Sequence, residues 1–308
     1  MNASLEKRVL KGVSRSFYLS LRLLPRPMRG AASLAYLLAR TSDTLADSVA
    51  VPVTVRIECL RDFGDAIRGG SGRLDWPVEL LSAVVDARER SLLEHSRELC
   101  IWLENLPSEE SRLVREVLEV ILSGQSLDLE RFADASFENP VALSDDAALE
   151  DYAWRVAGSV GAFWTKLGFV TLRNDFSSAD EARLLEWGIS YGKGLQLVNI
   201  LRDMPEDLAA GRCYLPVADP WDRVGLLACH VKWLARAREW VGDGENYAKA
   251  LNSRRLSVAS VLPALIARET LGSLEGASWE DLQRRVKIPR RRVYQLIIKA
   301  FVEYSGRK

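Results

Sequence analysis

The residues best suited to chemistry stand in two short acidic segments, and the first holds two carboxylates one helical turn apart. Asp43 and Asp47 are four residues apart, so both side chains leave the same face of a helix. Tyr36 and Arg40 continue that face at spacings of four and three. Two like charges so placed cost an isolated helix about 0.2–0.5 kcal/mol, and a positive partner is therefore expected. That partner is either Arg40, in a purely structural arrangement, or a divalent metal ion.

The second acidic segment places four oxygen-bearing side chains on one face of an otherwise apolar helix. Gln196, Asn199, Asp203 and Asp207 follow one another at spacings of three, four and four. Carboxylate and amide oxygens suit Mg²⁺ and do not suit zinc. Either acidic pair alone would more often be a surface feature. Together they predict two facing carboxylate walls that hold Mg²⁺ and a diphosphate between them.

The elements that must position these side chains are helices. Apolar residues recur at helical spacing almost throughout, and no clear run alternates as a strand would. The spacing predicts one helix over about 30–48, a second around 114–121 and a third around 195–201. Since no break is long enough for a linker, we predict a single all-α domain over residues 1–308. The breaks fall at Pro25 and Pro27, Gly69 to Gly72, Asn139-Pro140, Asp219-Pro220 and Pro289.

Composition argues against several classes of protein. The chain has 42 basic and 42 acidic residues, a balance that argues against a nucleic-acid-binding protein. Four cysteines without CxxC spacing and two histidines argue against a zinc site or a disulfide scaffold and favour free thiols in a reducing cytoplasm. The N-terminus lacks the apolar core of a secretory signal, and no stretch reaches the ~18–20 apolar residues that span a bilayer. A cytoplasmic location is therefore expected.

Positive charge gathers at both ends of the chain. Residues 1–40 carry eight Lys or Arg against one acid, and residues 281–308 carry nine against two. Such ends are either solvated faces or surfaces that attract polyphosphate ligands or an anionic membrane. The basic run 286–292 precedes an apolar helix over Val293–Val302. This helix is either a peripheral membrane-surface element or a helix docked on the core with a basic exposed face.

Six segments of the chain resemble, in order, motifs of the squalene/phytoene synthase family, the head-to-head isoprenoid synthases. The two acidic segments resemble the family's paired aspartate motifs. Residues 152–161 are similar to its YCxxVAGxVG stretch, with Ala153 in place of the usual cysteine. The other three are Ser14-Arg15-Ser16-Phe17, which resembles the N-terminal signature, Gly124 to Asp128, which resembles a middle-helix motif, and Gly211 to Pro216, which follows GRxYxP.

This resemblance implies an all-α isoprenoid-synthase fold with a central apolar cavity whose mouth binds the diphosphates. It implies that Mg²⁺ is bound by Asp43 and Asp47 from one side and by Asn199, Asp203 and Asp207 from the other. Bound Mg²⁺ helps the allylic C–O bond to ionise. The diphosphate-binding residues implied are Ser14, Arg15, Ser16, Arg40, Gln196, Arg202, Arg212 and Tyr214.

The implied reaction joins two prenyl diphosphates, with farnesyl diphosphate favoured. The carbocation left by ionisation is attacked by the C2=C3 double bond of the second substrate, which gives a cyclopropylcarbinyl diphosphate. Arg40 and Arg202 are expected to stabilise the leaving group. Tyr152 and Tyr36 are expected to steer the cation or to assist proton removal, for which the departing diphosphate is an equally reasonable base.

Members of the family differ in chain length and in the fate of this intermediate. Asp43-Thr44 resembles the DTxED motif of squalene synthases, although Ala46 and Ser48 replace two of its acids. Ser260 to Leu271 resembles their AIPQVMAxATL helix, with Ala264 in place of glutamine. These features favour reduction by NADPH to squalene. Dehydrosqualene, phytoene and released presqualene diphosphate stay as alternatives.

Other readings of the sequence have less support. NADPH has no independent signature, because Gly192 and Gly194 lie inside a helical pattern and more readily serve close helix packing. Lys193 between them is more readily a solvated lysine than a phosphate contact. A class I terpene cyclase would show the aspartate doublet of DDxxD, but Ser42 precedes Asp43. A non-catalytic helical scaffold would give no reason for the polar face of the second acidic segment.

Overall fold

The computed structural model describes residues 21–304, and it confirms the predicted all-α class. By their internal contacts these residues form two compact units. The first unit holds residues up to 130 together with 166–173, and the second holds 131–165 together with the residues from 174 onward. The single domain expected over the whole chain stays a prediction.

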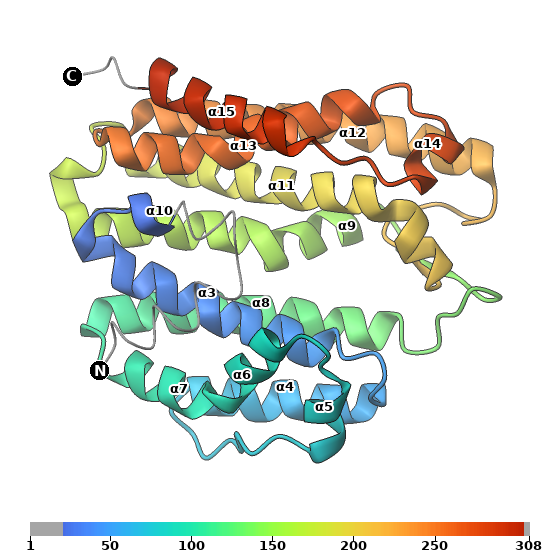
Figure 1. The fold of residues 1–308 in the computed structure, drawn as a ribbon, viewed down its shortest axis with the longest axis horizontal. Coiled ribbons are helices and arrows are strands. Elements are labelled where there is room, and N and C mark those ends of the chain that lie inside the picture. Colours follow the sequence, from blue (N-terminus) through green and yellow to red (C-terminus); the bar gives the residue numbers. More distant parts are fainter. Residues whose placement is uncertain (1–20, 305–308) are drawn as a thin grey trace. The chain divides into compact units, whose positions relative to one another are not determined.

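The first unit contains the helix that carries Asp43. Helix α3 (Arg26–Ala46) begins directly after Pro25 and buries Leu34, Leu37, Leu38 and Leu45 completely, so the apolar spacing seen in the sequence faces the core of the unit. Helices α6 and α7 pack against it (Figure 1). The other helices of the unit are α4 (Val53–Ile67), α5 (Val78–Ala83), α6 (Ala87–Glu94), α7 (Ser96–Glu104) and α8 (Ser108–Arg131), whose last residue belongs to the second unit.

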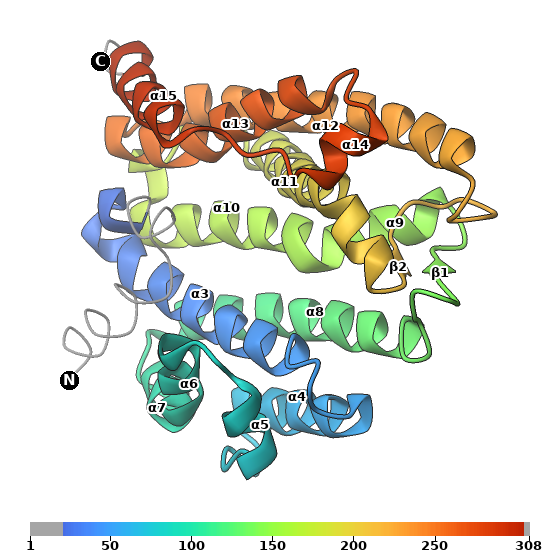
Figure 2. The ribbon, with the colours of Figure 1, turned by 45° about the vertical axis from the view of Figure 1, so that its right-hand side comes forward.

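The second unit is built on three long helices that lie side by side, α11 (Glu181–Ala209), α12 (Arg223–Ala250) and α13 (Arg254–Leu274) (Figure 2). Helix α15 (Arg290–Glu303) runs along α13, and α14 (Trp279–Gln283) lies beside α11. The remaining elements are β1 (Val141–Ala142), α9 (Asp146–Ala153), the π-helical turn η1 (Trp154–Gly158), α10 (Ser159–Leu172), whose last residues belong to the first unit, η2 (Arg173–Asp175) and β2 (Arg212–Cys213).

Glycines let the helices of the second unit approach closely. A Cβ at Gly192 would lie 2.2 Å from the carbonyl oxygen of Ala157, and one at Gly194 would lie 2.9 Å from the backbone nitrogen of Val241. Gly161 and Gly188 meet backbone to backbone in the same way. The sequence-based interpretation of Gly192 and Gly194 as packing positions is therefore confirmed.

The structure adds one feature that the sequence pattern did not reveal. Strands β1 and β2 pair in parallel over two residues each, which is too short for an alternating pattern to reveal. Pro205 and Pro263 lie inside α11 and α13, so the helices expected over these two segments continue through both prolines. No helix among the described residues is long and apolar enough to cross a membrane.

Candidate active site

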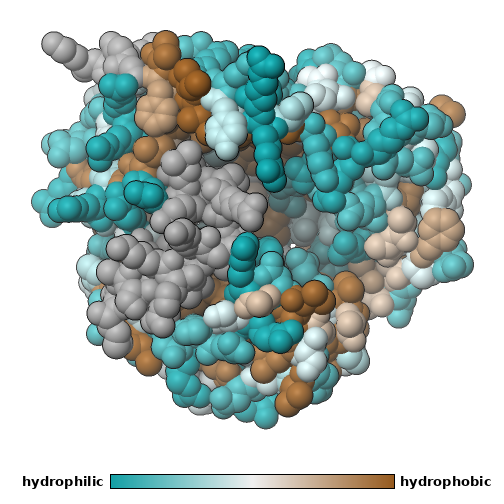
Figure 3. All heavy atoms as spheres, in the orientation of Figure 1, coloured by the Kyte–Doolittle hydropathy of each residue, from teal (hydrophilic) through white to brown (hydrophobic). Residues whose placement is uncertain are grey.

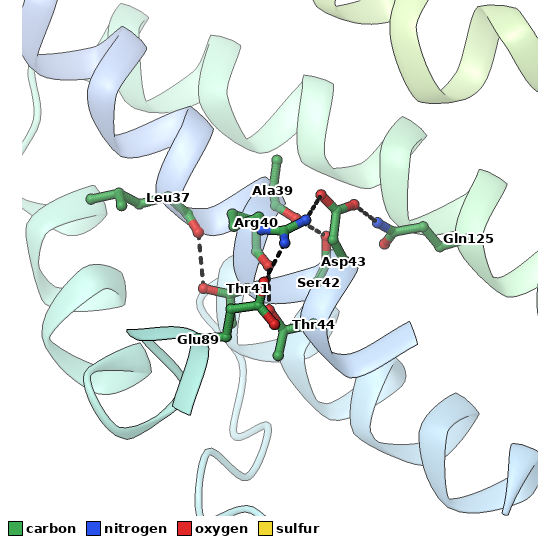
Figure 4. Close-up of polar contacts among 9 residues, drawn as sticks. All are labelled: Leu37, Ala39, Arg40, Thr41, Ser42, Asp43, Thr44, Glu89 and Gln125. Atoms are coloured by element: carbon green, nitrogen blue, oxygen red, sulfur yellow. Dashed lines mark hydrogen bonds and ion pairs between the residues drawn. The ribbon is translucent and has the colours of Figure 1, made fainter. Parts of the chain in front are cut away.

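The first acidic motif occupies the last turn of α3 (Figure 4). The Asp43 carboxylate accepts a hydrogen bond from Gln125 Nε2 of α8 at 2.7 Å, and its other oxygen lies 3.5 Å from Arg40 Nη1. Arg40 in turn donates to Glu89 at the start of α6. Three helices of the first unit therefore fix the orientation of one carboxylate, which a lone surface pair would not need.

The hydroxyl groups of the residues just before Asp43 donate hydrogen bonds to backbone carbonyl oxygens of α3. Thr41 donates to the carbonyl oxygen of Leu37 at 2.9 Å, and Ser42 donates to that of Ala39 at 2.7 Å. Such back-bonding lets small polar residues sit buried in a helix. Asp43 and Asp47 are the acidic residues at this end of the helix. Asp47 is the C-cap residue, and its backbone N–H donates to the carbonyl oxygen of Asp43 at 2.8 Å.

The charge of the Asp43 carboxylate is poorly compensated by the residues around it. Burial under neighbouring atoms, followed by the charge of Asp47, raises the pKa of Asp43 to about 6, although 43% of its side chain is solvent-accessible. Arg40 and the hydrogen bond from Gln125 act in the opposite direction but do not compensate. A divalent cation beside these carboxylates would supply the missing positive charge.

Gln125 adds a second sign of an incomplete site. Its side chain is buried, with 8% exposed, and its Oε1 atom has no hydrogen-bond partner among the described residues. A buried amide oxygen without a partner costs about 1–3 kcal/mol, so it commonly serves a bound group. A metal-bound water is the kind of donor that would suit it.

The second acidic motif lies on the C-terminal half of α11. Arg202 donates through Nε to Asp203 at 2.9 Å, and Arg212 of β2 donates through Nη2 to Asp207 at 3.0 Å. The side chains of Asp203 and Asp207 are 22% and 19% exposed, so both are reachable from solvent. Asn199 is exposed and Gln196 half-buried on the same helix.

Pro205 makes this stretch of α11 unusual. Proline has no N–H, so residue 205 cannot donate the helical hydrogen bond to the carbonyl oxygen of Leu201. The ring of His230 on α12, which is 3% exposed, places Nε2 3.2 Å from that oxygen. With Nε2 protonated, His230 replaces the missing backbone donor. It thereby supports the turn that presents Asp203 and Asp207.

Arg285 also reaches this motif, and sequence reasoning did not single it out. Its Nε lies 3.6 Å from Asp203 Oδ1 and its Nη1 lies 3.4 Å from Glu206 Oε2. The residue has a φ of +58°, a conformation that costs a non-glycine residue about 1 kcal/mol or more. An open pocket of about 280 Å³ lies at this point, lined by Arg202, Asp203, Pro205, Glu206, Leu282, Gln283 and Arg285.

Two aromatic residues predicted from different motifs meet in the second unit. The rings of Tyr152 and Tyr214 stack with centroids 5.0 Å apart and an angle of 21° between their planes. Tyr214 follows β2, which the pairing of residues 141 and 212 holds in place. The turn before β2 requires a glycine at residue 211 for two reasons. Its φ is +82°, and a Cβ there would lie 2.5 Å from the backbone nitrogen of Ser136.

The structure corrects the interpretation of Lys193. The sequence suggested a solvated lysine or, less readily, a phosphate contact. Instead its side chain is only 16% exposed, pairs with Glu150 at 3.1 Å and lies 3.9 Å above the ring of Trp240. Lys193 therefore serves the packing of α9, α11 and α12.

The described residues suit a Mg²⁺ ion that is bound jointly by protein carboxylates and by the substrate. Among residues 21–304 no three His, Cys, Asp or Glu side chains stand close enough to enclose a metal by themselves. Mg²⁺ is commonly held by one or two carboxylates together with substrate phosphates and water, which suits paired aspartates. Ser14, Arg15 and Ser16 lie outside the described residues. Tyr36 lies one turn before Arg40 and contributes to its electrostatic environment.

Comparison with known proteins places the chain in a family. The sequence model of squalene/phytoene synthases matches residues 10–292. The presqualene diphosphate synthase of Rhodopseudomonas palustris is 30% identical over 230 residues, which cover 74% of this chain and 68% of that protein. The bifunctional lycopene cyclase/phytoene synthase of Phaeosphaeria nodorum is 29% identical over 210 residues, which cover 68% of this chain. This chain thus spans about a third (33%) of that relative's length.

Solved structures share the fold. TcSQS in complex with the ligand E5700 aligns with a TM-score of 0.77 at 22% identity, covering 98% of this chain and 88% of that one. At this identity the likeness concerns the fold alone. The match of the family model over most of the sequence carries the assignment, and the chain belongs to the squalene/phytoene synthase family.

Proposed function

We propose that this chain is a Mg²⁺-dependent prenyltransferase that joins two prenyl diphosphates head to head. The observation that carries the proposal is that each family aspartate motif places carboxylates beside an arginine, Arg40 with Asp43 and Arg202 with Asp203. Carboxylates alone would repel a diphosphate, whereas carboxylates that hold a cation beside fixed guanidinium groups would bind it.

Asp43 and Asp47 would hold Mg²⁺ in the first motif, and Asn199, Asp203 and Asp207 would do so in the second. Bound Mg²⁺ would supply the charge neutralisation that lets a diphosphate leave as an allylic C–O bond ionises. Arg202, Arg212 and Arg285 would turn guanidinium N–H groups toward the diphosphate oxygens, because their present carboxylate partners are the residues that the cation would engage.

The stacked pair Tyr152 and Tyr214 suits the carbocation that remains. Aromatic faces attract cations, by about 2 kcal/mol or more where water is excluded. Both rings are buried, with 9% and 8% exposed. We propose that their faces hold the cation for attack by the C2=C3 bond of the second substrate. The released diphosphate, or a tyrosine hydroxyl, would accept the proton lost when the cyclopropane ring closes.

Farnesyl diphosphate is the substrate that we propose, with presqualene diphosphate as the first product. Support comes from the presqualene diphosphate synthase of Rhodopseudomonas palustris, of which this chain covers two thirds. Reduction by NADPH to squalene is the second candidate. It is favoured by Asp43-Thr44 and by the segment Ser260 to Leu271, which forms the buried middle of α13. Dehydrosqualene or phytoene would be the outcome of elimination without reductant.

Product analysis by mass spectrometry tests these alternatives. The full chain would be incubated with Mg²⁺ and farnesyl or geranylgeranyl diphosphate, each with and without NADPH. We expect presqualene diphosphate from farnesyl diphosphate in the absence of NADPH. Squalene formed only with NADPH would establish the second candidate, whereas a cyclic terpene or no product would overturn the proposal.

Matched variants test the role of the motifs in the same assay. Asp43→Asn and Asp203→Asn keep the side-chain shape and are expected to lower turnover by orders of magnitude. Asp75→Asn and Glu239→Gln are the controls, because their side chains are 88% and 66% exposed and make single surface ion pairs. Turnover near the wild-type rate in either motif variant would refute the metal role.

A further inference from the structure

The outward face of α15 carries an apolar stripe that nothing in the described structure covers. Tyr294, Ile298 and Val302 are 66%, 64% and 69% exposed. Their spacing of four residues places them on one face of the helix. Figure 3 shows hydrophobic side chains at the surface over the C-terminal half of α15, at the upper left. A row of three large exposed apolar side chains differs from the single ones that any surface carries.

The opposite face fixes α15 to the second unit. Leu296 and Ala300 are buried, with 2% and 0% exposed. Arg292 donates to both carboxylate oxygens of Glu269 on α13, at 3.0 and 2.7 Å. The helix is therefore docked, and the stripe faces away from the core to which the helix is attached. Of the two sequence-based alternatives for this segment, the structure confirms the docked helix, whose exposed face is apolar as well as basic. The membrane-surface alternative stays a prediction.

The charge around the stripe has one sign. From Arg284 to Tyr304 the sequence has seven basic residues and a single acid, Glu303. Glu303 is paired with Lys299 at 3.7 Å. Lys287, shortly before the helix, and Arg290 and Arg291 in its first turn are exposed. An apolar stripe bordered by cations is the composition of a helix that lies in the plane of a membrane surface.

We infer that the outward face of α15 binds an anionic lipid surface. The three apolar side chains would enter the boundary between headgroups and acyl chains, and the arginines would bind lipid phosphates. Fourteen residues make a helix about 21 Å long, which suffices to lie on a membrane but not to cross it. A second copy of the chain is disfavoured as the partner, because a two-fold interface would bring the basic residues of both copies together.

Co-sedimentation of the full chain with lipid vesicles tests this inference. We expect binding to vesicles of phosphatidylcholine mixed with phosphatidylglycerol, and weaker binding to phosphatidylcholine alone. The variant Tyr294→Ser/Ile298→Ser/Val302→Ser is expected to lose at least about tenfold in affinity, since apolar area drives insertion. Val224→Ser/Val231→Ser is the matched control, because these valines on α12 are 79% and 65% exposed. Arg290→Gln/Arg291→Gln should reduce binding most at low salt.

Hydrogen exchange supplies a readout that does not depend on how well a variant folds. In the wild-type chain, anionic vesicles should protect amides of α15 and leave those of α12 unchanged. Equal vesicle binding by the triple serine variant and the wild type would overturn the inference. An absence of binding between the wild type and anionic vesicles would overturn it as well. Self-association of the wild type that the triple variant abolishes would also overturn it, in favour of an interface between copies.

Discussion

Replacing His230 with leucine is expected to weaken the fold at the second aspartate motif. His230 Nε2 lies 3.2 Å from the carbonyl oxygen of Leu201, the acceptor that Pro205 cannot serve. Leucine fills a similar volume but donates no hydrogen bond. A buried carbonyl left without a partner costs about 1–3 kcal/mol, and we expect the free energy of unfolding to fall by this amount.

A double-mutant cycle isolates this hydrogen bond from other effects of the substitution. Pro205→Ala restores a backbone N–H that can serve Leu201, so in that background His230→Leu should cost about 1 kcal/mol less. Pro263→Ala is the matched control, because Pro263 also lies inside a helix but has no part in this contact. The assay is urea unfolding followed by circular dichroism, with all six chains compared at one pH.

The same residue predicts how stability depends on pH. Burial lowers the pKa of His230 below its ordinary value of 6.5, and the bond to Leu201 only partly offsets this. The unfolded chain therefore binds more protons just below pH 6.5, and the free energy of unfolding falls as pH falls through that range. His230→Gln, which keeps a donor but does not titrate, should flatten this part of the profile. In the double-mutant cycle, an equal loss of unfolding free energy on His230→Leu in the wild-type and Pro205→Ala backgrounds would refute the role of this hydrogen bond.

Three further predictions follow from other contacts. Gly192→Ala should destabilise the chain by about 1–3 kcal/mol, because its Cβ would meet the Ala157 carbonyl oxygen at 2.2 Å, whereas Gly272→Ala, with open space around it, should be neutral or stabilising in thermal unfolding. Arg285→Gln should tighten Mg²⁺ binding measured by calorimetry by about two- to fivefold, because an ion pair worth about 0.5–1 kcal/mol no longer competes for Asp203, while Arg284→Gln should change nothing. Lys193→Met should lower stability by up to about 1 kcal/mol, because it removes an ion pair whose carboxylate is 37% exposed, yet keep pyrophosphate binding intact; weaker binding would restore a phosphate role.

Much of the site could be predicted because helical spacing alone decides which side chains share a face. Asp43 lies on α3 and Asp47 caps the C-terminal end of that helix, while Asp203 and Asp207 both lie on α11. The breaks at Pro25 and Pro289 also fall directly before helices, since proline's missing N–H is tolerated there.

The partners of these carboxylates could not be predicted, because each comes from a distant part of the chain. Glu89 reaches Arg40 from α6, and no local pattern marks it. Gln125 stood in a quoted motif, but its contact with Asp43 spans 82 positions. Arg285 looked like one of many basic tail residues until the fold brought it to Asp203. His230 of α12, which supplies the hydrogen-bond donor that Pro205 lacks, lies 29 positions from Leu201.

The central claim is that one chain joins two prenyl diphosphates, and isotope mixing tests it most directly. Equal amounts of unlabelled and fully deuterated farnesyl diphosphate would be incubated with the chain and Mg²⁺, and the products would be resolved by mass spectrometry. The account predicts three product masses, with the mixed species the most abundant, and their loss in Asp43→Asn and Asp203→Asn. Only two masses, each derived from a single substrate molecule, would contradict it.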